Sequence, residues 1–202
     1  MVEHLVKFKG KRVFITGHTG FKGAWLSYLL DKHGAIVKGY SLAPSTNPSL
    51  FNSLKFSSSF ESVIEDIRAF SLLQKELNFF KPDYVFHLAA QPLVLESYRN
   101  PHETFTTNAL GTLNILEVIR QANFSPVTII VTTDKVYENL EQNIPFKEED
   151  KLGGNDPYSA SKSAAEMIVN SYQKSFCLKN SLTIASARAG NVIGGGDRKS
   201  VV

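Results

Sequence analysis

Short apolar runs alternate along the chain with longer segments of helical spacing. The run at 12–16 is typical of a buried strand, and residues 24–34 repeat large apolar side chains at helical spacing until Gly34, a residue that favours a helix end. The same alternation continues to the end of the chain. It predicts strands at 12–16, 36–40, 62–65, 84–88, 127–132 and 182–187, and helices at 24–34, 70–79, 103–122 and 158–176.

Six strands separated by helices predict an α/β fold with a Rossmann-type, doubly wound parallel sheet. In such sheets ligands bind where the carboxyl ends of the strands meet the loops, so the candidate chemistry is expected there. The polar stretch at 138–156 contains two adjacent glycines and is expected to run over the surface. One domain therefore dominates the chain.

Composition and charge exclude several classes of protein. The chain has 202 residues, 43% of them hydrophobic and 20% charged, which is enough for a core without metal or disulfide support. Lys and Arg number 22 against 19 Asp and Glu, and this net charge of +3 forms no basic stripe, so nucleic acid is not expected as a partner. The single cysteine, Cys177, indicates a reducing compartment, and no apolar run reaches the length of a signal peptide or membrane span. We expect a cytoplasmic protein with no membrane partner.

A glycine-rich turn with a GxxGxxG pattern separates the first strand from the first helix. Glycines there let the backbone approach a pyrophosphate, which the free N–H groups and partial positive charge of a helix N-terminus also attract. We interpret the turn as a dinucleotide-binding site, in which the side chains of His18 and Lys22 either contact the cofactor or face solvent. The cofactor-binding residues expected in this turn are Gly17, His18, Gly20, Phe21, Lys22 and Gly23.

Other strand ends supply further candidates. Residues 39–42 contain neither the acidic residue that binds an adenosine ribose nor an arginine for a 2′-phosphate. The end of the second strand therefore does not distinguish NAD from NADP as the cofactor. Asp66 either meets the adenine ring or caps its own loop. Gln91 is either a sugar contact or part of ordinary packing. The further cofactor-binding residues that we expect are Asp66, Ile67, Leu88, Ala89 and Ala90.

Tyr158 and Lys162 stand four residues apart near the start of a predicted helix. This spacing places both side chains on one face, with the ammonium near the phenol and the cofactor ribose, so both residues are expected to bind the cofactor as well. A free tyrosine has a pKa of about 10, and lowering it to about 7 takes roughly 4 kcal/mol of phenolate stabilisation, which Lys162 and an oxidised nicotinamide could supply. In a chain with a dinucleotide turn, we interpret the pair as catalytic rather than as a surface pair.

A hydroxyl, a carboxyl and an amine follow one another at the end of the fifth strand, on Thr133, Asp134 and Lys135. At the carboxyl edge of a sheet all three side chains can project into a substrate crevice. The simpler interpretation is a polar strand end in which Asp134 caps the next turn. The neighbouring dinucleotide and Tyr–Lys motifs favour a catalytic role.

Together these motifs resemble the extended short-chain dehydrogenase/reductase family over essentially the whole chain. The residues that carry the resemblance are the three turn glycines, His87 to Ala90, Thr133, the Tyr158–Lys162 pair and Arg188 to Asn191. Further segments resemble the sugar-nucleotide 4,6-dehydratases of this family that act on CDP-glucose, above all Asp134-Lys135, where relatives acting on dTDP-glucose have Asp-Glu. The resemblance implies NAD as the cofactor, a nucleotide sugar as the substrate, and a homodimer formed through the helices at 103–122 and 158–176.

The resemblance also implies a redox-neutral loss of water. Tyr158, helped by Lys162 and Thr133, would accept the proton of the sugar 4-hydroxyl while hydride passes to NAD. Lys135 would then remove the C5 proton while Asp134 protonates the departing C6 hydroxyl, which requires a partly neutral Lys135, favoured by burial or a nearby positive charge. An epimerase or reductase of the same fold would need only Tyr158 and Lys162, and an inert NAD-binding module neither.

The remaining residues of note have simpler interpretations. Asn191 either binds the substrate pyrophosphate or forms a turn, and Asn108 is expected to be a structural hydrogen-bonding residue. His87 is expected to be a buried core histidine, and Cys177 a packing residue. The histidines, cysteine and carboxylates show no metal-ligand spacing, so no metal is expected.

The resemblance bears on domain organisation as well. Residues 1–188 are expected to form the NAD-binding domain with the catalytic residues. The family continues into a smaller domain that holds the nucleotide of the substrate. Residues 189–202 are therefore expected to begin that region, most of which would be absent from this chain.

Overall fold

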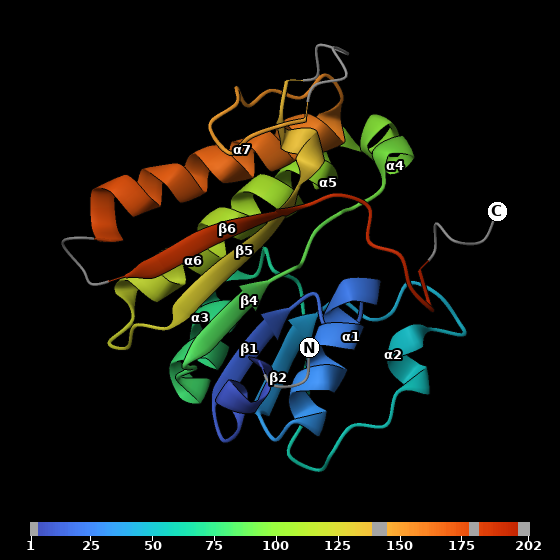
Figure 1. The fold of residues 1–202 in the computed structure, drawn as a ribbon, viewed down its shortest axis with the longest axis vertical. Helices are drawn as coiled ribbons and strands as arrows, with labels where there is room; N and C mark the ends of the chain where they lie inside the picture. Colours follow the sequence, from blue (N-terminus) through green and yellow to red (C-terminus); the bar gives the residue numbers. More distant parts are fainter. Residues whose placement is uncertain (1–3, 139–144, 178–181, 198–202) are drawn as a thin grey trace.

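The computed structural model describes residues 4–138, 145–177 and 182–197. At its centre lies a six-stranded sheet of order β3-β2-β1-β4-β5-β6, in which every neighbouring pair is parallel (Figure 1). Its strands are β1 (Arg12–Thr16), β2 (Ile36–Ser41), β3 (Glu61–Ile64), β4 (Tyr84–His87), β5 (Val127–Thr133) and β6 (Thr183–Ala189). Each lies within two residues of its predicted position, which confirms the Rossmann-type fold.

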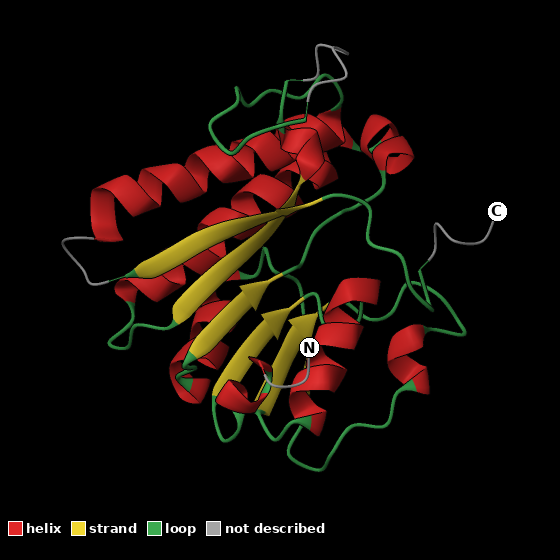
Figure 2. Ribbon diagram, viewed as in Figure 1, coloured by secondary structure: helices red, strands yellow, loops and turns green. Residues whose placement is uncertain are grey.

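Helices cover both faces of this sheet (Figure 2). The helices are α1 (Phe21–Lys32), α2 (Leu50–Ser53), α3 (Phe70–Phe80), α4 (Val94–Arg99), α5 (Pro101–Phe105), α6 (Gly111–Gln121) and α7 (Pro157–Tyr172). Of these, α2 and α4 were not predicted, because four and six residues are too few for a helical period to show. No described helix is both long and apolar enough to cross a membrane.

Two apolar clusters hold the layers together. Val13 and Ile15 of β1 pack with Leu30 of α1 on one face of the sheet. Between them Phe14 points to the other face, where it joins Leu77 of α3 and residues of α6 and α7. The alternation arises because successive strand side chains point to opposite faces, and both faces of a parallel sheet are buried.

The helix predicted at 103–122 contains a π-helical segment, η3 (Thr106–Leu110), between α5 and α6. Asn108 lies in this segment and is fully buried. Its carboxamide accepts a hydrogen bond from the Gln91 amide at 2.8 Å and donates to the Gln91 carbonyl at 3.1 Å and the Ser161 hydroxyl at 2.9 Å. The structural role expected for Asn108 is confirmed, and these long-range contacts account for the wide turn that local periodicity did not predict.

Candidate functional site

The strand order reverses between β1 and β4, the point at which a doubly wound sheet opens a ligand crevice. Thr16 and His87, the last residues of these strands, hydrogen-bond through Oγ1 and Nδ1 at 2.7 Å. The amides of Leu88 and Ala89 donate to the same Thr16 oxygen at 3.1 and 3.2 Å. His87 is 1% exposed, and burial, followed by the charge of Lys162, lowers its pKa to about 3. It is the core histidine that was expected.

The glycine turn is packed tightly between β1 and α1. Gly17 has a φ of +75°, and a Cβ there would lie 2.6 Å from the Ala89 nitrogen. A Cβ on Gly23 would lie 2.1 Å from the Gly17 carbonyl oxygen. Gly20 differs, because its Cβ would meet only that oxygen, at 3.4 Å. The turn therefore leaves its open side at Gly20, directly before the N-terminus of α1, where a pyrophosphate would fit.

The His18 side chain lies elsewhere than predicted. Its ring is fully buried between Phe51 and Phe60, and its Nε2 hydrogen-bonds the Ser62 hydroxyl at 2.7 Å. The ring occupies the space beside Gly39 of β2, where a Cβ would come within 2.3 Å of it. Burial lowers the His18 pKa to about 4, so the ring is neutral at pH 7. The solvent-facing alternative is wrong, and a cofactor contact through the backbone stays a prediction.

Beyond β3, the structure favours the local role of Asp66. Its carboxylate accepts from the Arg68 amide at 2.8 Å and pairs with the Arg68 guanidinium at 2.5 Å. These hydrogen bonds to Arg68 lower the pKa of Asp66. Ile67 is 4% exposed and packs against Gly111 of α6. The expected contact of these two residues with an adenine ring stays a prediction.

Helix α7 carries the Tyr158–Lys162 pair. Asp156 caps its N-terminus by accepting from the Ser159 amide at 3.0 Å, and Pro157 occupies the first turn. Tyr158 is 9% and Lys162 6% exposed, so both side chains face inward, as the spacing of four predicted.

The ammonium of Lys162 lies in a buried environment. Its Nζ donates to the Val131 carbonyl of β5 at 3.3 Å. Burial, followed by the charge of Lys22, lowers the pKa of Lys162 to about 8. Lys22, half-buried at the start of α1, therefore lies close enough to Lys162 for its charge to act there.

The Tyr158 phenol has a less favourable environment than expected. Burial raises its pKa, a hydrogen bond with Thr133 lowers it, and the charges of Asp134 and Asp156 raise it again. The net result is a Tyr158 pKa above its ordinary value, so the lowering expected beside Lys162 is not seen. An oxidised nicotinamide, when bound, would supply further stabilisation of the phenolate.

Thr133, Asp134 and Lys135 meet at the carboxyl end of β5, where a 3-10 turn, η4 (Asp134–Val136), begins. Thr133 caps this turn through the Lys135 amide at 3.3 Å, so the alternative in which Asp134 caps the turn is wrong. The Asp134 carboxylate accepts from the Thr133 hydroxyl at 2.9 Å and pairs with the Lys135 ammonium at 3.4 Å. The Lys135 and Asp134 side chains are 41% and 47% exposed, so burial, one of the two conditions named for a neutral Lys135, is not found.

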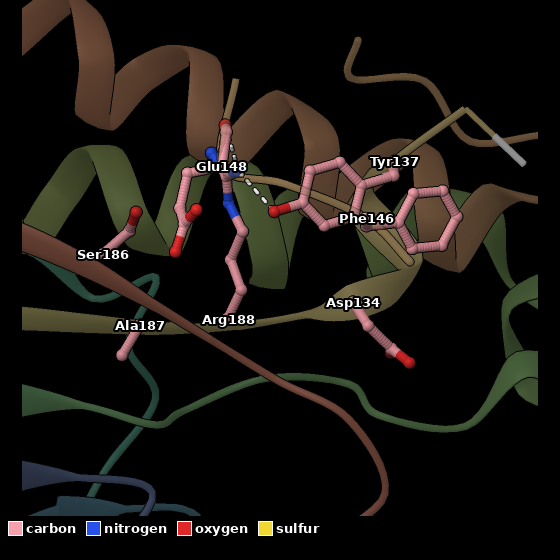
Figure 3. A pocket seen from close by; sticks show the side chains of 7 residues that line it. All are labelled: Asp134, Tyr137, Phe146, Glu148, Ser186, Ala187 and Arg188. Carbon is pink, nitrogen blue, oxygen red and sulfur yellow. Dashed lines mark hydrogen bonds between the residues drawn. The ribbon is translucent and has the colours of Figure 1, made fainter. Parts of the chain in front are cut away.

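Asp134 also lines a cavity of about 570 Å³ beside the ends of β5 and β6 (Figure 3). Tyr137 and Phe146 form one wall, with stacked rings whose centroids are 4.7 Å apart. The lining residues are Asp134, Tyr137, Phe146, Glu148, Ser186, Ala187 and Arg188. The candidate acid thus borders open space large enough for a small ligand.

The two predicted substrate residues have different settings. The Gln91 carboxamide is engaged in internal contacts, accepting from the Leu93 amide at 2.6 Å and donating to Thr104 of α5 at 2.9 Å. Asn191 is exposed in the segment that leaves β6 and reaches α1, where Trp25 donates to the Gly195 carbonyl at 3.0 Å (Figure 1). The sugar and pyrophosphate contacts of Gln91 and Asn191 stay predictions.

Sequence reasoning missed Glu166, which is 3% exposed on α7 one turn after Lys162. A carboxylate on the same helical face as Tyr158 and Lys162 is the signal that could have found it. Cys177, by contrast, is a packing residue as expected, partly buried against the core.

Comparisons with known proteins agree with this geometry. Residues 14–195 match the family described as GDP-mannose 4,6 dehydratase. The chain is 48% identical to the CDP-glucose 4,6-dehydratase of Salmonella typhimurium, over 94% of this chain and 54% of that protein.

The fold is also similar to that of solved structures. An epimerase of Methanothermobacter thermautotrophicus matches with a TM-score of 0.84 and 28% identity, over 96% of this chain and 56% of that one. A UDP-glucose 4-epimerase of Thermus thermophilus, solved in complex with NAD, has a TM-score of 0.75 and 28% identity over 91% and 56%. The chain therefore spans about half the length of the relatives it matches.

Proposed function

The chain belongs to the GDP-mannose 4,6-dehydratase family, and from that premise we propose that it forms the cofactor-binding and catalytic part of a CDP-glucose 4,6-dehydratase. The observation that carries the proposal is the Asp134–Lys135 pair, held at the end of β5 beside Thr133 and opposite Tyr158. An epimerase or reductase needs a tyrosine for proton transfer during the redox step, but it needs no acid and base for elimination. The 48% identity to a CDP-glucose 4,6-dehydratase supports the same choice.

We propose NAD as the cofactor. The open side of Gly20, the N-terminus of α1 and the ammonium groups of Lys22 and Lys162 form a cradle suited to a pyrophosphate and ribose. When bound, NAD would supply a site that accepts hydride from C4 of the sugar and returns it to C6. At the end of β2, the Ser41 hydroxyl bonds Thr19 at 2.8 Å where a carboxylate is more usual.

Two glycine variants test this cradle separately from the fold. Gly23→Ala places a methyl group 2.1 Å from the Gly17 carbonyl and is expected to lower the free energy of unfolding by about 2 kcal/mol or more. Gly20→Ala meets no such contact and should fold normally, but its methyl group occupies the open side of the turn. We expect it to weaken NAD binding about tenfold or more, measured by calorimetry. Unchanged NAD affinity in Gly20→Ala would contradict the proposed cradle.

In the proposed reaction Tyr158 acts first. Its phenolate accepts the proton of the sugar 4-hydroxyl, and Thr133, which already bonds the phenol, keeps it aimed at that oxygen. Lys162 holds a positive charge nearby at neutral pH, because its pKa of about 8 lies above the working pH. The resulting 4-ketone acidifies the proton on C5.

Asp134 and Lys135 then carry out the elimination. The neutral Lys135 amine takes the C5 proton, the C5–C6 double bond forms, and Asp134 gives its proton to the C6 hydroxyl, which leaves as water. This step leaves a carboxylate beside an ammonium, which is the ion pair seen here at 3.4 Å. The Lys135 ammonium would then give its proton to C5 as hydride is returned to C6, which completes the 4-keto-6-deoxy sugar. The proton that Tyr158 took from the 4-hydroxyl balances the one that Asp134 gave to the water, and exchange with solvent restores both groups. Partial exposure of both side chains lets a substrate displace solvent from them.

Conversion of CDP-glucose tests the proposed function. A hybrid protein, in which this chain replaces the matching part of the Salmonella typhimurium relative, is incubated with NAD and CDP-glucose and followed by mass spectrometry. We expect loss of one water from CDP-glucose. Isomerisation without loss of water would instead favour an epimerase. Tight NAD binding by a folded hybrid with no turnover would favour an inert module.

Assembly and location also stay predictions. A homodimer through α6 and α7 is supported by apolar side chains exposed on that side, with Leu110 of η3 49% and Met167 of α7 62% exposed. The nucleotide sugar is the proposed small-molecule partner, and the cytoplasm the proposed location.

A further inference from the structure

Glu166 is a buried carboxylate to which the proposed reaction gives no role. It lies one helical turn after Lys162 on α7 and is 3% exposed. Thr132, the residue before Thr133 on β5, donates its hydroxyl to one carboxylate oxygen. The other oxygen accepts from the Ser186 hydroxyl at 2.9 Å and the Arg188 guanidinium at 3.0 Å. Burial is the largest single influence and raises the Glu166 pKa, but the hydrogen bonds to Arg188, Thr132 and Ser186 and the charge of Arg188 together lower it, so the carboxylate is ionised at neutral pH.

These contacts tie the catalytic helix to both strands that end at the site. Through Thr132 the carboxylate fixes α7 against β5, directly behind Thr133, and through Arg188 it fixes α7 against β6. The other end of the Arg188 guanidinium donates to the Tyr137 hydroxyl at 2.9 Å and the Glu148 carbonyl at 2.8 Å, in the wall of the cavity (Figure 3). Displacing the carboxylate would therefore disturb helix, strands and cavity wall together.

Glu166 also supplies the negative charge near the Lys162 ammonium. The titratable groups that influence or flank this ammonium are Lys22 of α1, His87 of β4, Tyr158 and Glu166. Burial and Lys22 favour the neutral amine, whereas Glu166 favours the charged form. His87 and Tyr158 are both neutral near pH 7 and supply no negative charge.

We propose that Glu166 is a positioning residue for the reaction, which holds α7 against β5 and β6 and keeps the Lys162 ammonium charged. This proposal rests on the proposed function in one respect, namely that Lys162 takes part in the reaction. The contacts of Glu166 and the charge of Lys162 can be measured without substrate.

The test is a titration of Lys162 in the full chain by NMR of its side-chain ¹³Cε and ¹⁵Nζ, assigned with Lys162→Arg. In Glu166→Gln we expect the midpoint of Lys162 to fall by about 1 pH unit, because an opposite charge within a helical turn has been removed. Glu166→Asp keeps the charge and should restore the midpoint. Ser186→Ala is the matched control, because it removes one hydrogen bond from the same carboxylate and leaves its charge.

Removal of one partner from a buried ion pair can unfold a protein, whereas removal of both partners lowers the free energy of unfolding less. The double variant Glu166→Gln/Arg188→Gln covers that case and should show the same lowered midpoint. An unchanged Lys162 midpoint in the folded Gln variants would overturn the proposal, and so would equal shifts in Glu166→Asp and Glu166→Gln. Neither result depends on whether CDP-glucose is the substrate, so failure of this inference is distinct from failure of the proposed function.

Discussion

Lys135→Met in the hybrid protein is expected to abolish water loss while leaving oxidation at C4 intact. Methionine keeps the length of the side chain but cannot accept a proton. General bases contribute about 10² to 10⁴ in rate, so elimination should fall by that factor. Oxidation should continue, because Tyr158, Lys162 and Thr133 are unchanged, and reduced nicotinamide should then accumulate and be visible by absorbance.

Lys151→Met is the matched control for this variant. Lys151 is a surface lysine that is 76% exposed and pairs with Glu138 at 2.9 Å, in the same chain segment that follows the site. Its replacement should leave both half-reactions unchanged. If the Lys135→Met hybrid releases water from CDP-glucose as fast as the unmodified hybrid does, Lys135 is not the base and the elimination needs another residue.

Tyr158→Phe is expected to stop the reaction earlier, at oxidation. The phenol is the group placed to take the proton of the 4-hydroxyl, and phenylalanine removes it without changing the packing of α7. We expect a loss of about 10² to 10⁴ in the rate of nicotinamide reduction, with no release of water. Because Tyr158 must lose a proton before it can accept one, activity should rise with pH on the acid side of the profile.

Tyr172→Phe provides the control on the same helix. Tyr172 is also 9% exposed and also hydrogen-bonded, in its case to Glu117 at 2.7 Å, but it lies at the far end of α7. It should keep full activity. Equal losses in the two variants would indicate damage to α7 rather than loss of a catalytic phenol.

Sequence patterns predicted the central strands β1, β2, β4 and β5 well because their side chains are mainly buried or half-buried. Near-continuous apolar runs such as 12–16 and 127–132 leave few other interpretations. The end of each strand then places the glycine turn, Thr133 and the loop after β4 at one edge by topology alone. The existence of the site could therefore be predicted before any contact was known.

What the sequence did not predict depends on contacts between distant segments. The π-helical turn at Asn108 exists because its side chain reaches Gln91 and Ser161. The His18 side chain was expected either to contact the cofactor or to face solvent, but its ring is buried because Gly39 leaves room beside it. A glycine inside a strand often marks such a close approach, so that signal was present in the sequence.

The position of the sugar hydrogen that starts on C4 tests the central claim most directly. CDP-glucose carrying deuterium at C4 is converted by the hybrid protein in ordinary water, and the product is examined by NMR and mass spectrometry. We predict a product that has lost one water and carries the deuterium on C6, because the hydride removed from C4 is returned there. Deuterium retained on C4 of a sugar that has lost no water would contradict the dehydratase assignment.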